Sequence, residues 1–149
     1  MVRYLTGEEV ESVVSFGADM GLAEEGAGDG PDTAVTLLRL TIVAIASIDN
    51  SRRSRHYDQR AEVFGPGGVV CVENQPAVAR PETDDDIPFF AQRYRDSYLA
   101  EMSAFVECVR RDRQPEVSGN DGRAALVLAL AALRSYREGR PVTVSEAGG

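Results

Sequence analysis

The sequence predicts an α+β fold, in which a mostly antiparallel, open-faced β-sheet carries two long helices packed on one face. Two observations carry this prediction. Segments with strand patterns fill the first half of the chain up to residue 72, and the two longest segments with helical periodicity follow at 88–109 and 118–138. Strands that come first and helices that come after favour a sheet whose helices gather on one side.

Length and composition are those of one globular domain spanning residues 1–149. A chain of this size buries about two-thirds of its unfolded surface. No apolar run approaches the roughly 20 residues of a membrane span, and the first residues lack the basic-then-apolar pattern of a signal peptide. We therefore expect a soluble cytoplasmic protein with no membrane partner.

The charged and sulfur-containing residues exclude several classes of function. A net charge of −8 argues against nucleic acid as a partner, because nucleic-acid binding rests on positive charge that neutralises phosphates. All 16 basic side chains are arginine, so no lysine can act as a base or form a Schiff base. Cys71 and Cys108 lack the paired spacing of a metal or redox motif. We therefore expect both side chains to be buried and to pack like small hydrophobic residues.

The first elements are predicted from helix-stop and strand signals. Residues 1–5 have the pattern of the last turn of a helix, with Gly7 where helices commonly stop, and a strand is expected over 9–18. The acidic, glycine-rich residues 21–30 could be read as a phosphate cradle. Their spacing matches neither the dinucleotide nor the P-loop pattern, so we interpret them as a solvated connection.

Residues 33–49 are rich in β-branched and aliphatic side chains and are too long for one ordinary strand. They predict two strands, although the intervening Thr41-Ile42-Val43 has no turn chemistry, so either tertiary context bends the chain there or the pairing is altered. Apolar side chains fall on both faces of these strands. Because two helices can cover only one face, the other face is expected to join subunits.

Residues 59–72 predict a β-hairpin. From Gln59 the side chains alternate, which places Arg60 and Glu62 on one face. The opposite face is expected to hold Ala61, Val63, Val69 and Cys71. Gly65-Pro66-Gly67-Gly68 supplies the positive-φ positions that a short hairpin needs.

The second half of the chain predicts the helices. The acidic run Asp84–Asp86 before Pro88 is typical of a helix start and favours that role over a metal site. Aromatic and aliphatic residues then recur every three or four positions to Val109, a pattern more typical of core packing than of ligand stacking. Ser118 and Asp121 predict a capping box before the apolar run 124–133, and an edge strand is expected over 140–144, after the Gly139 stop.

Four segments resemble the C-terminal half of inositol dehydrogenases in the glucose-fructose oxidoreductase, inositol dehydrogenase and MocA (Gfo/Idh/MocA) family. They are Ile-Asp-Asn-Ser-Arg-Arg with Tyr-Asp-Gln-Arg-x-Glu-Val-Phe-Gly (48–53 and 57–65), Phe-Phe-x-x-Arg-Tyr-x-x-x-Tyr-x-x-Glu (89–101), Asp-Gly-Arg-x-Ala-Leu (121–126) and Glu-Gly-Arg-Pro-Val (138–142). They occur in the family's order, and together they cover most of the chain.

The resemblance implies that this chain is the substrate-binding and oligomerisation domain of an NAD(P)-dependent inositol 2-dehydrogenase-like enzyme acting on a small polyol or sugar. In that family a catalytic aspartate and histidine lie on a helix before the position of Met1, and the nucleotide-binding domain and catalytic lysine lie earlier still. The chain is thus expected to hold no catalytic, cofactor-binding or metal-binding residue. NAD or NADP would be bound by the full-length parent, and subunits would form a dimer or tetramer through the open sheet face.

The resemblance places the candidate substrate-binding residues at Tyr57 and His56. A tyrosine at this position lies near the bound polyol in the family, where its hydroxyl can donate or accept a hydrogen bond. The family commonly has Tyr-Gly-Tyr-Asp there, whereas this chain has Arg55-His56-Tyr57-Asp58, so either residue could face the substrate.

The arginines around the candidate site have a simpler interpretation. We expect at least two of Arg52, Arg53 and Arg60 to be structural and to pair with carboxylates such as Asp49 or Glu62. The alternative function is a stand-alone polyol-binding or assembly module without redox activity.

Overall fold

The computed structural model describes residues 1–19, 30–53, 58–73 and 94–148. The chain divides into two compact units, one formed by residues 1–53 with 116–149 and the other by residues 54–115. The single domain over 1–149 stays a prediction.

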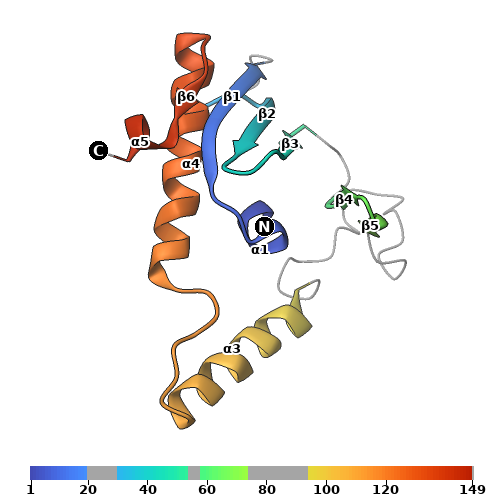
Figure 1. Ribbon diagram of the computed structural model, residues 1–149, viewed down its shortest axis with the longest axis vertical. Helices are drawn as coiled ribbons and strands as arrows, with labels where there is room; N and C mark the ends of the chain where they lie inside the picture. The colour runs from blue at the N-terminus through green and yellow to red at the C-terminus, as the bar shows by residue number, and fades with distance from the viewer. Residues whose placement is uncertain (20–29, 54–57, 74–93, 149) are drawn as a thin grey trace. The chain divides into compact units, whose positions relative to one another are not determined.

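The first unit contains a four-stranded, fully antiparallel sheet with the order β3-β2-β1-β6 (Figure 1). Its strands are β1 (Val10–Ala18), β2 (Thr33–Leu40), β3 (Ile45–Ser51) and β6 (Val142–Thr143). The predicted α+β class is confirmed. The short last strand lies at an edge, where the preceding Pro141 costs no ladder hydrogen bond.

The core lies between the sheet and helix α4 (Gly119–Glu138), which runs along the sheet in Figure 1. Directly opposite residues of neighbouring strands point to the same face, so Val13 and Leu38, which pair, both reach α4. The buried cluster consists of Val10, Val13, Leu38, Leu40, Ala131 and Val142. Burial of these side chains is the main stabilising contribution to this unit.

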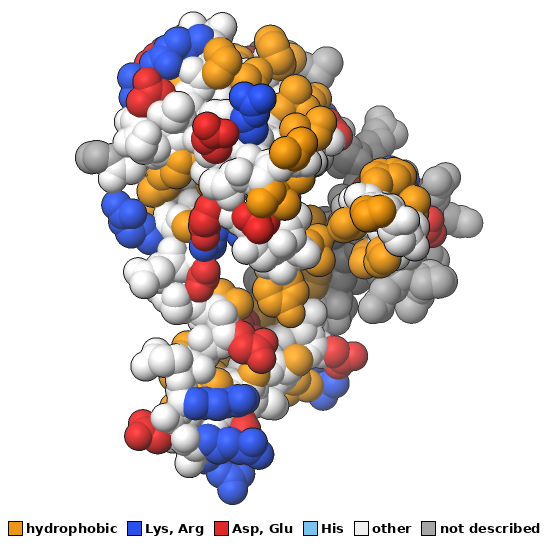
Figure 2. All heavy atoms as spheres, viewed as in Figure 1, with side chains coloured by type: hydrophobic (Ala, Val, Ile, Leu, Met, Phe, Trp, Pro, Cys, Tyr) orange, Lys and Arg blue, Asp and Glu red, His pale blue; other side chains and the backbone are white. Residues whose placement is uncertain are grey.

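The opposite face of the same sheet is apolar and is not covered by any described element of the first unit. The ladder places Phe16 opposite Val35 and Val14 opposite Leu37. Phe16 is 66% exposed and Leu37 is 46% exposed. Ile45, 84% exposed and paired with Arg39, extends this open face onto β3, and Figure 2 shows hydrophobic side chains gathered over these strands.

The chain turns between β2 and β3 at Thr41-Ile42-Val43, although these residues have no turn chemistry of their own. Two strands form as predicted, because contacts with a distant segment bend the chain. The N–H of Thr41 donates to the carbonyl of Glu9 (3.0 Å), and the Thr41 hydroxyl donates to the Glu8 carboxylate (3.0 Å). The N–H of Leu40 donates to the carbonyl of Ala44 (3.1 Å) and closes the turn.

The helix ends follow the predicted local signals. Helix α1 (Val2–Thr6) stops at Gly7, whose φ is 70°, and α4 stops at Gly139, whose φ is 63°. The carboxylate of Asp121 accepts hydrogen bonds from both the N–H and the hydroxyl of Ser118, each at 2.8 Å. A short helix α5 (Val144–Ala147) follows β6. Within the described ranges, no helix is long and apolar enough to cross a membrane.

The second unit contains a hairpin of β4 (Ala61–Gly65) and β5 (Gly68–Val72), and helix α3 (Arg95–Arg110). The hairpin is confirmed, but the predicted faces of its second strand are wrong. Val63 pairs with Val70 and Phe64 pairs with Val69, so Val69 and Cys71 share the face of Glu62 and Phe64. The two-residue turn sets this register, and one residue of slip moves every side chain to the other face.

The cysteine predictions had different outcomes. Cys108 is buried as predicted, whereas Cys71 is exposed, because it lies on a two-stranded ribbon that has no second layer among the described residues.

The predicted helix start at Asp84–Asp86 and Pro88 lies outside the described residues. The aromatic and aliphatic stripe continues on α3, where Tyr98, Met102 and Phe105 recur at helical spacing.

Candidate functional site

The candidate substrate-binding residues His56 and Tyr57 lie outside the described residues. The structure describes the chain on both sides of them, up to Arg53 in the first unit and from Asp58 in the second. In each unit, the structure shows which contacts hold the described residues next to this segment.

A buried carboxylate holds the first end. The side chain of Asp32, which directly precedes β2, is 7% exposed. The guanidinium of Arg53 donates to its Oδ2 twice, from Nε at 3.1 Å and from Nη2 at 2.8 Å. Since a buried charge is costly unless it is paired and hydrogen-bonded, Asp32 requires a guanidinium at this position.

Arg52 adds a second cation and a set of backbone contacts to the same corner. Its Nη2 lies 3.7 Å from Asp32 Oδ1. The same nitrogen lies 3.4 Å from the carbonyl oxygen of Pro31, and the N–H of Arg52 donates to the carbonyl of Asp32 at 2.9 Å. The end of β3 is thus joined to the start of β2 through both side chains and backbone.

The second end is held within the other unit. Arg60 Nε donates to Asp58 Oδ1 at 2.9 Å, and the hydroxyl of Tyr94 donates to Gln59 Oε1 at 2.7 Å. Both contacts involve exposed side chains, so each contributes less than the Asp32 pair.

The structural interpretation of the arginines is confirmed, with different partners from those expected. Arg52 and Arg53 pair with Asp32, and Arg60 pairs with Asp58, in place of Asp49 and Glu62. The pairing of Thr33 with Ser51 places Asp32 beside Arg52. The sequence did contain a signal for the pairing with Asp32. In a hairpin, an acidic residue just before one strand lies opposite the residue that follows the other strand. This signal can be used only when the register of the two strands is known.

A second charged cluster ties α1 to the start of α4. Arg3 donates to both carboxylate oxygens of Glu9, at 2.6 and 2.8 Å, and to Asp121 at 3.1 Å. These contacts raise the pKa of Arg3 and, through the Arg3 hydrogen bond, lower the pKa of Glu9. The pKa of Asp121 is lowered first by the Ser118 N–H, then by the Ser118 hydroxyl and Arg3. The cluster is structural, since all three groups are satisfied by one another.

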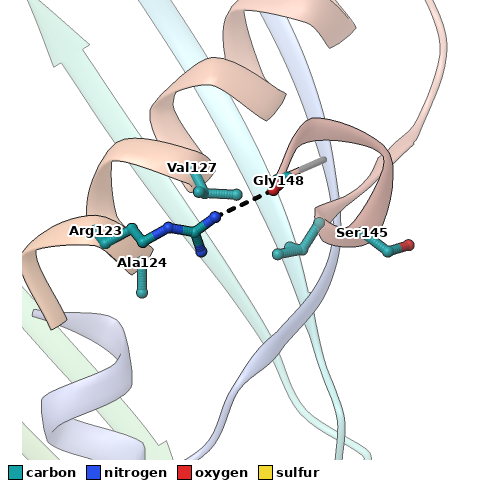
Figure 3. Close-up of a pocket in the computed structure, with 6 residues that line it drawn as sticks. Arg123, Ala124, Val127, Ser145 and Gly148 are labelled. Atoms are coloured by element: carbon teal, nitrogen blue, oxygen red, sulfur yellow. Dashed lines mark hydrogen bonds between the residues drawn. The ribbon is translucent and has the colours of Figure 1, made fainter. Parts of the chain in front are cut away.

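A hollow of about 370 Å³ lies between α4 and α5. Figure 3 shows the Arg123 guanidinium reaching across it to the carbonyl of Gly148, at 3.1 Å. Its remaining walls are Ala124, Val127, Val144 and Ser145. Among the described residues that line it, Arg123 is the one titratable group, and its guanidinium is already bound to the backbone. In the described part of the chain, no group of three or more His, Cys, Asp or Glu side chains is placed to hold a metal ion.

A sequence profile described as "Oxidoreductase family, C-terminal alpha/beta domain" matches residues 1–144. The chain is 42% identical to the myo-inositol 2-dehydrogenase of Thermotoga maritima, over 98% of this chain and 46% of that protein. It is 33% identical to the scyllo-inositol 2-dehydrogenase (NAD(+)) of Bacillus subtilis, over 95% of this chain and 44% of that protein.

The fold is also that of a solved structure. The crystal structure of a probable dehydrogenase from Thermotoga maritima superposes with a TM-score of 0.84 at 41% identity, over 98% of this chain and 46% of that one. The chain therefore spans about half the length of the curated relatives it matches.

Proposed function

This chain belongs to the Gfo/Idh/MocA oxidoreductase family, and from that membership we propose that it is the substrate-binding and oligomerisation part of an NAD(P)-dependent dehydrogenase acting on inositol or a related polyol. The observation that carries the proposal is the match over 98% of the chain, at 42% identity, to a myo-inositol 2-dehydrogenase. The name of the Bacillus subtilis relative, which includes NAD(+), supports the cofactor class.

The role proposed for this chain in the reaction follows from the residues that it contains. It has no lysine, and its single histidine is one of the two candidate substrate-binding residues. A bound nicotinamide would accept the hydride from a ring carbinol. The role of this chain would be to hold the polyol through hydroxyl and imidazole groups at Tyr57 and His56, and proton transfer would fall to residues outside it. We expect the parent enzyme to be cytoplasmic.

The open sheet face supports the oligomerisation part of the proposal. Phe16, Val35 and Leu37 are neighbours in the ladder and are exposed in the first unit. A soluble monomer rarely leaves such a contiguous apolar area uncovered, and a two-fold contact would bury the same patch on both subunits.

The test is a chimera that joins the first half of the Thermotoga maritima enzyme to residues 1–149 of this chain. We expect it to reduce NAD with myo-inositol, and we expect the 149-residue chain alone to bind neither NAD nor NADP at micromolar concentration in calorimetry. The intact Thermotoga maritima enzyme is the control for assay conditions.

Two results would count against the proposal. One is a chimera that folds and binds NAD but oxidises no member of a panel of inositols and sugars. The other is tight nicotinamide binding by the 149-residue chain. If the inactive chimera were accompanied by polyol binding to the isolated chain, the stand-alone polyol-binding module would be the better description.

A further inference from the structure

We propose that Arg39 and Asp49, on the open sheet face, form two reciprocal ion pairs between two copies of this chain, with Arg39 of each copy bound to Asp49 of the other. The inference rests on the oligomerisation part of the proposed function. It adds to that function the contacts that align the two copies and select a second copy of this chain as the partner for the face.

The first argument is the position of the two charges in the ladder. Leu37 on β2 pairs with Ser47 on β3. Arg39 is two residues further along β2, and Asp49 is two residues further along β3, which runs in the opposite direction. Steps of two residues stay on one face, so both charges lie on the open face with Leu37, and both residues are exposed. The two charges therefore stand on opposite sides of the Leu37–Ser47 pair.

The second argument is that these charges have no partner within one copy. Asp49 is paired with Val35, four residues from Arg39 along β2, so the rise of a strand separates the two Cα atoms by roughly 14 Å. Strand side chains stand nearly perpendicular to the sheet and do not reach across such a span. In the described part of the chain, no ion pair includes either side chain.

The third argument is what covering the face requires. Phe16, 66% exposed, and Leu37, 46% exposed, make the face apolar, so a cover that buries them also takes Arg39 and Asp49 out of water. A buried charge is costly unless it is paired. A purely apolar cover would leave both charges unpaired, whereas a second copy brings one opposite charge for each.

A two-fold axis can make both pairs at once. The axis would lie in the interface and cross the strands at the Leu37–Ser47 pair. Rotation about it reverses the strand direction of the second copy, so the Arg39 end of each face meets the Asp49 end of the other. Facing sheets pack about 10 Å apart, a gap that opposed arginine and aspartate side chains can bridge. The same rotation brings the two copies of Leu37 together near the axis.

The first experiment reverses each charge in the 149-residue chain and measures the dimer Kd by sedimentation equilibrium. Arg39→Asp and Asp49→Arg each place like charges opposite one another in both pairs. Each variant should raise the dimer Kd at least about a hundredfold, because a juxtaposition of like charges at an interface costs several-fold more than a tenfold loss of affinity. Arg113→Asp, which reverses an exposed charge outside the sheet, is the matched control and should keep the wild-type Kd.

The second experiment mixes the two variants in equal amounts. Arg39→Asp and Asp49→Arg, each monomeric alone, should form a mixed dimer with a Kd near that of the wild type. In that dimer, aspartate at position 39 of one chain faces arginine at position 49 of the other, and the unaltered Arg39 and Asp49 make the second pair. The double variant in one chain should also dimerise. Recovery in the double variant without recovery in the mixture would mean that the pair forms within one chain, and it would overturn the proposal.

Failure of the pair and failure of the proposed function give different results. A monomeric wild type refutes the oligomerisation part of the proposed function and the ion pairs with it. A dimeric wild type whose Kd is the same in Arg39→Asp and Arg113→Asp leaves oligomerisation standing and refutes the pairs. If circular dichroism shows that a charge reversal unfolds the chain, Arg39→Gln and Asp49→Asn replace it. Both should weaken the dimer and reduce the dependence of its Kd on salt, and an unchanged Kd would overturn the proposal.

Discussion

The hydroxyl of Ser135, on α4, accepts a hydrogen bond from the backbone N–H of Ser15, on β1, at 3.0 Å inside the core. The ladder between β1 and β6 covers only the pairs Ser12 with Thr143 and Val13 with Val142. Ser135 therefore replaces a strand partner for Ser15. The same hydroxyl donates to the carbonyl of Arg140 at 2.6 Å, so one side chain joins the helix, the strand and the segment after the helix.

Ser135→Ala should lower the free energy of unfolding by about 1–3 kcal/mol, because it leaves the buried N–H of Ser15 and the part-buried carbonyl of Arg140 without this partner. Urea denaturation followed by circular dichroism measures the change. Ser103→Ala, on the exposed surface of α3, is the control and should be neutral or slightly stabilising, since alanine is the better helix former. Equal urea midpoints for Ser135→Ala and Ser103→Ala would show that the Ser135 hydroxyl contributes little to stability.

Gly17→Ala should destabilise the first unit by about 1–3 kcal/mol through overpacking. A Cβ at Gly17 would lie 2.6 Å from two side-chain atoms of Pro31 and 3.1 Å from Tyr136. Gly122→Ala is the matched control, because a Cβ there meets nothing within 4 Å and the position lies in α4. That variant should be more stable than the wild type by about 0.4–1 kcal/mol. A stabilising Gly17→Ala would mean that Pro31 can move away without cost.

Asp121→Asn should reduce the dependence of stability on pH in the acid range. The folded-state pKa of Asp121 lies below its ordinary value of 3.8, mainly because of the Ser118 hydrogen bonds. A lowered carboxyl pKa contributes stability that is complete above the unfolded-state value and is lost as the pH falls through the folded-state value.

The variant should therefore be less stable than the wild type at pH 7, and the two should converge between about pH 5 and pH 2. Thermal denaturation as a function of pH measures this. Glu101→Gln on α3 is the control for removal of one exposed carboxylate. A difference in melting temperature between the wild type and Asp121→Asn that stays constant down to pH 2 would exclude a contribution from the Asp121 charge.

Leu37→Glu should dissociate the proposed oligomer without unfolding the chain, because Leu37 lies on the open sheet face and is 46% exposed. Leu130→Glu is the matched control, since Leu130 is 48% exposed on α4. Glutamate substitutions at Leu40 and Leu128 are unsuitable for testing the interface, because Leu40 is in the core and Leu128 packs against the core. Light scattering at low micromolar concentration reports the mass. Dissociation by Leu130→Glu alone would move the interface to α4, and a monomeric wild type would refute the dimer.

Tyr57→Phe in the chimera should lower kcat/KM for the polyol several-fold and leave the affinity for NAD unchanged. Loss of one hydrogen bond to a substrate hydroxyl costs about 0.5–1.5 kcal/mol. Steady-state kinetics and NAD titration measure the two effects. Kinetics identical to the parent would leave His56 as the candidate.

Local signals in the sequence determined the secondary structure well. The stop at Gly7, the capping box of Ser118 and Asp121 and the presence of a hairpin turn at residues 65–68 each depend on atoms within a few residues, so they were readable without the fold. The resemblance carried by residues 48–65 likewise predicted the family to which the chain belongs.

Tertiary structure decided which face each strand presents and which charges meet. Thr41 turns because Glu8 and Glu9, more than 30 residues away in the chain, accept its hydrogen bonds. Arg53 pairs with Asp32 rather than with a nearer carboxylate because the register of β2 and β3 brings them together. A register is chosen by the summed burial and hydrogen bonding of whole strands, and that sum exists only once the strands have met.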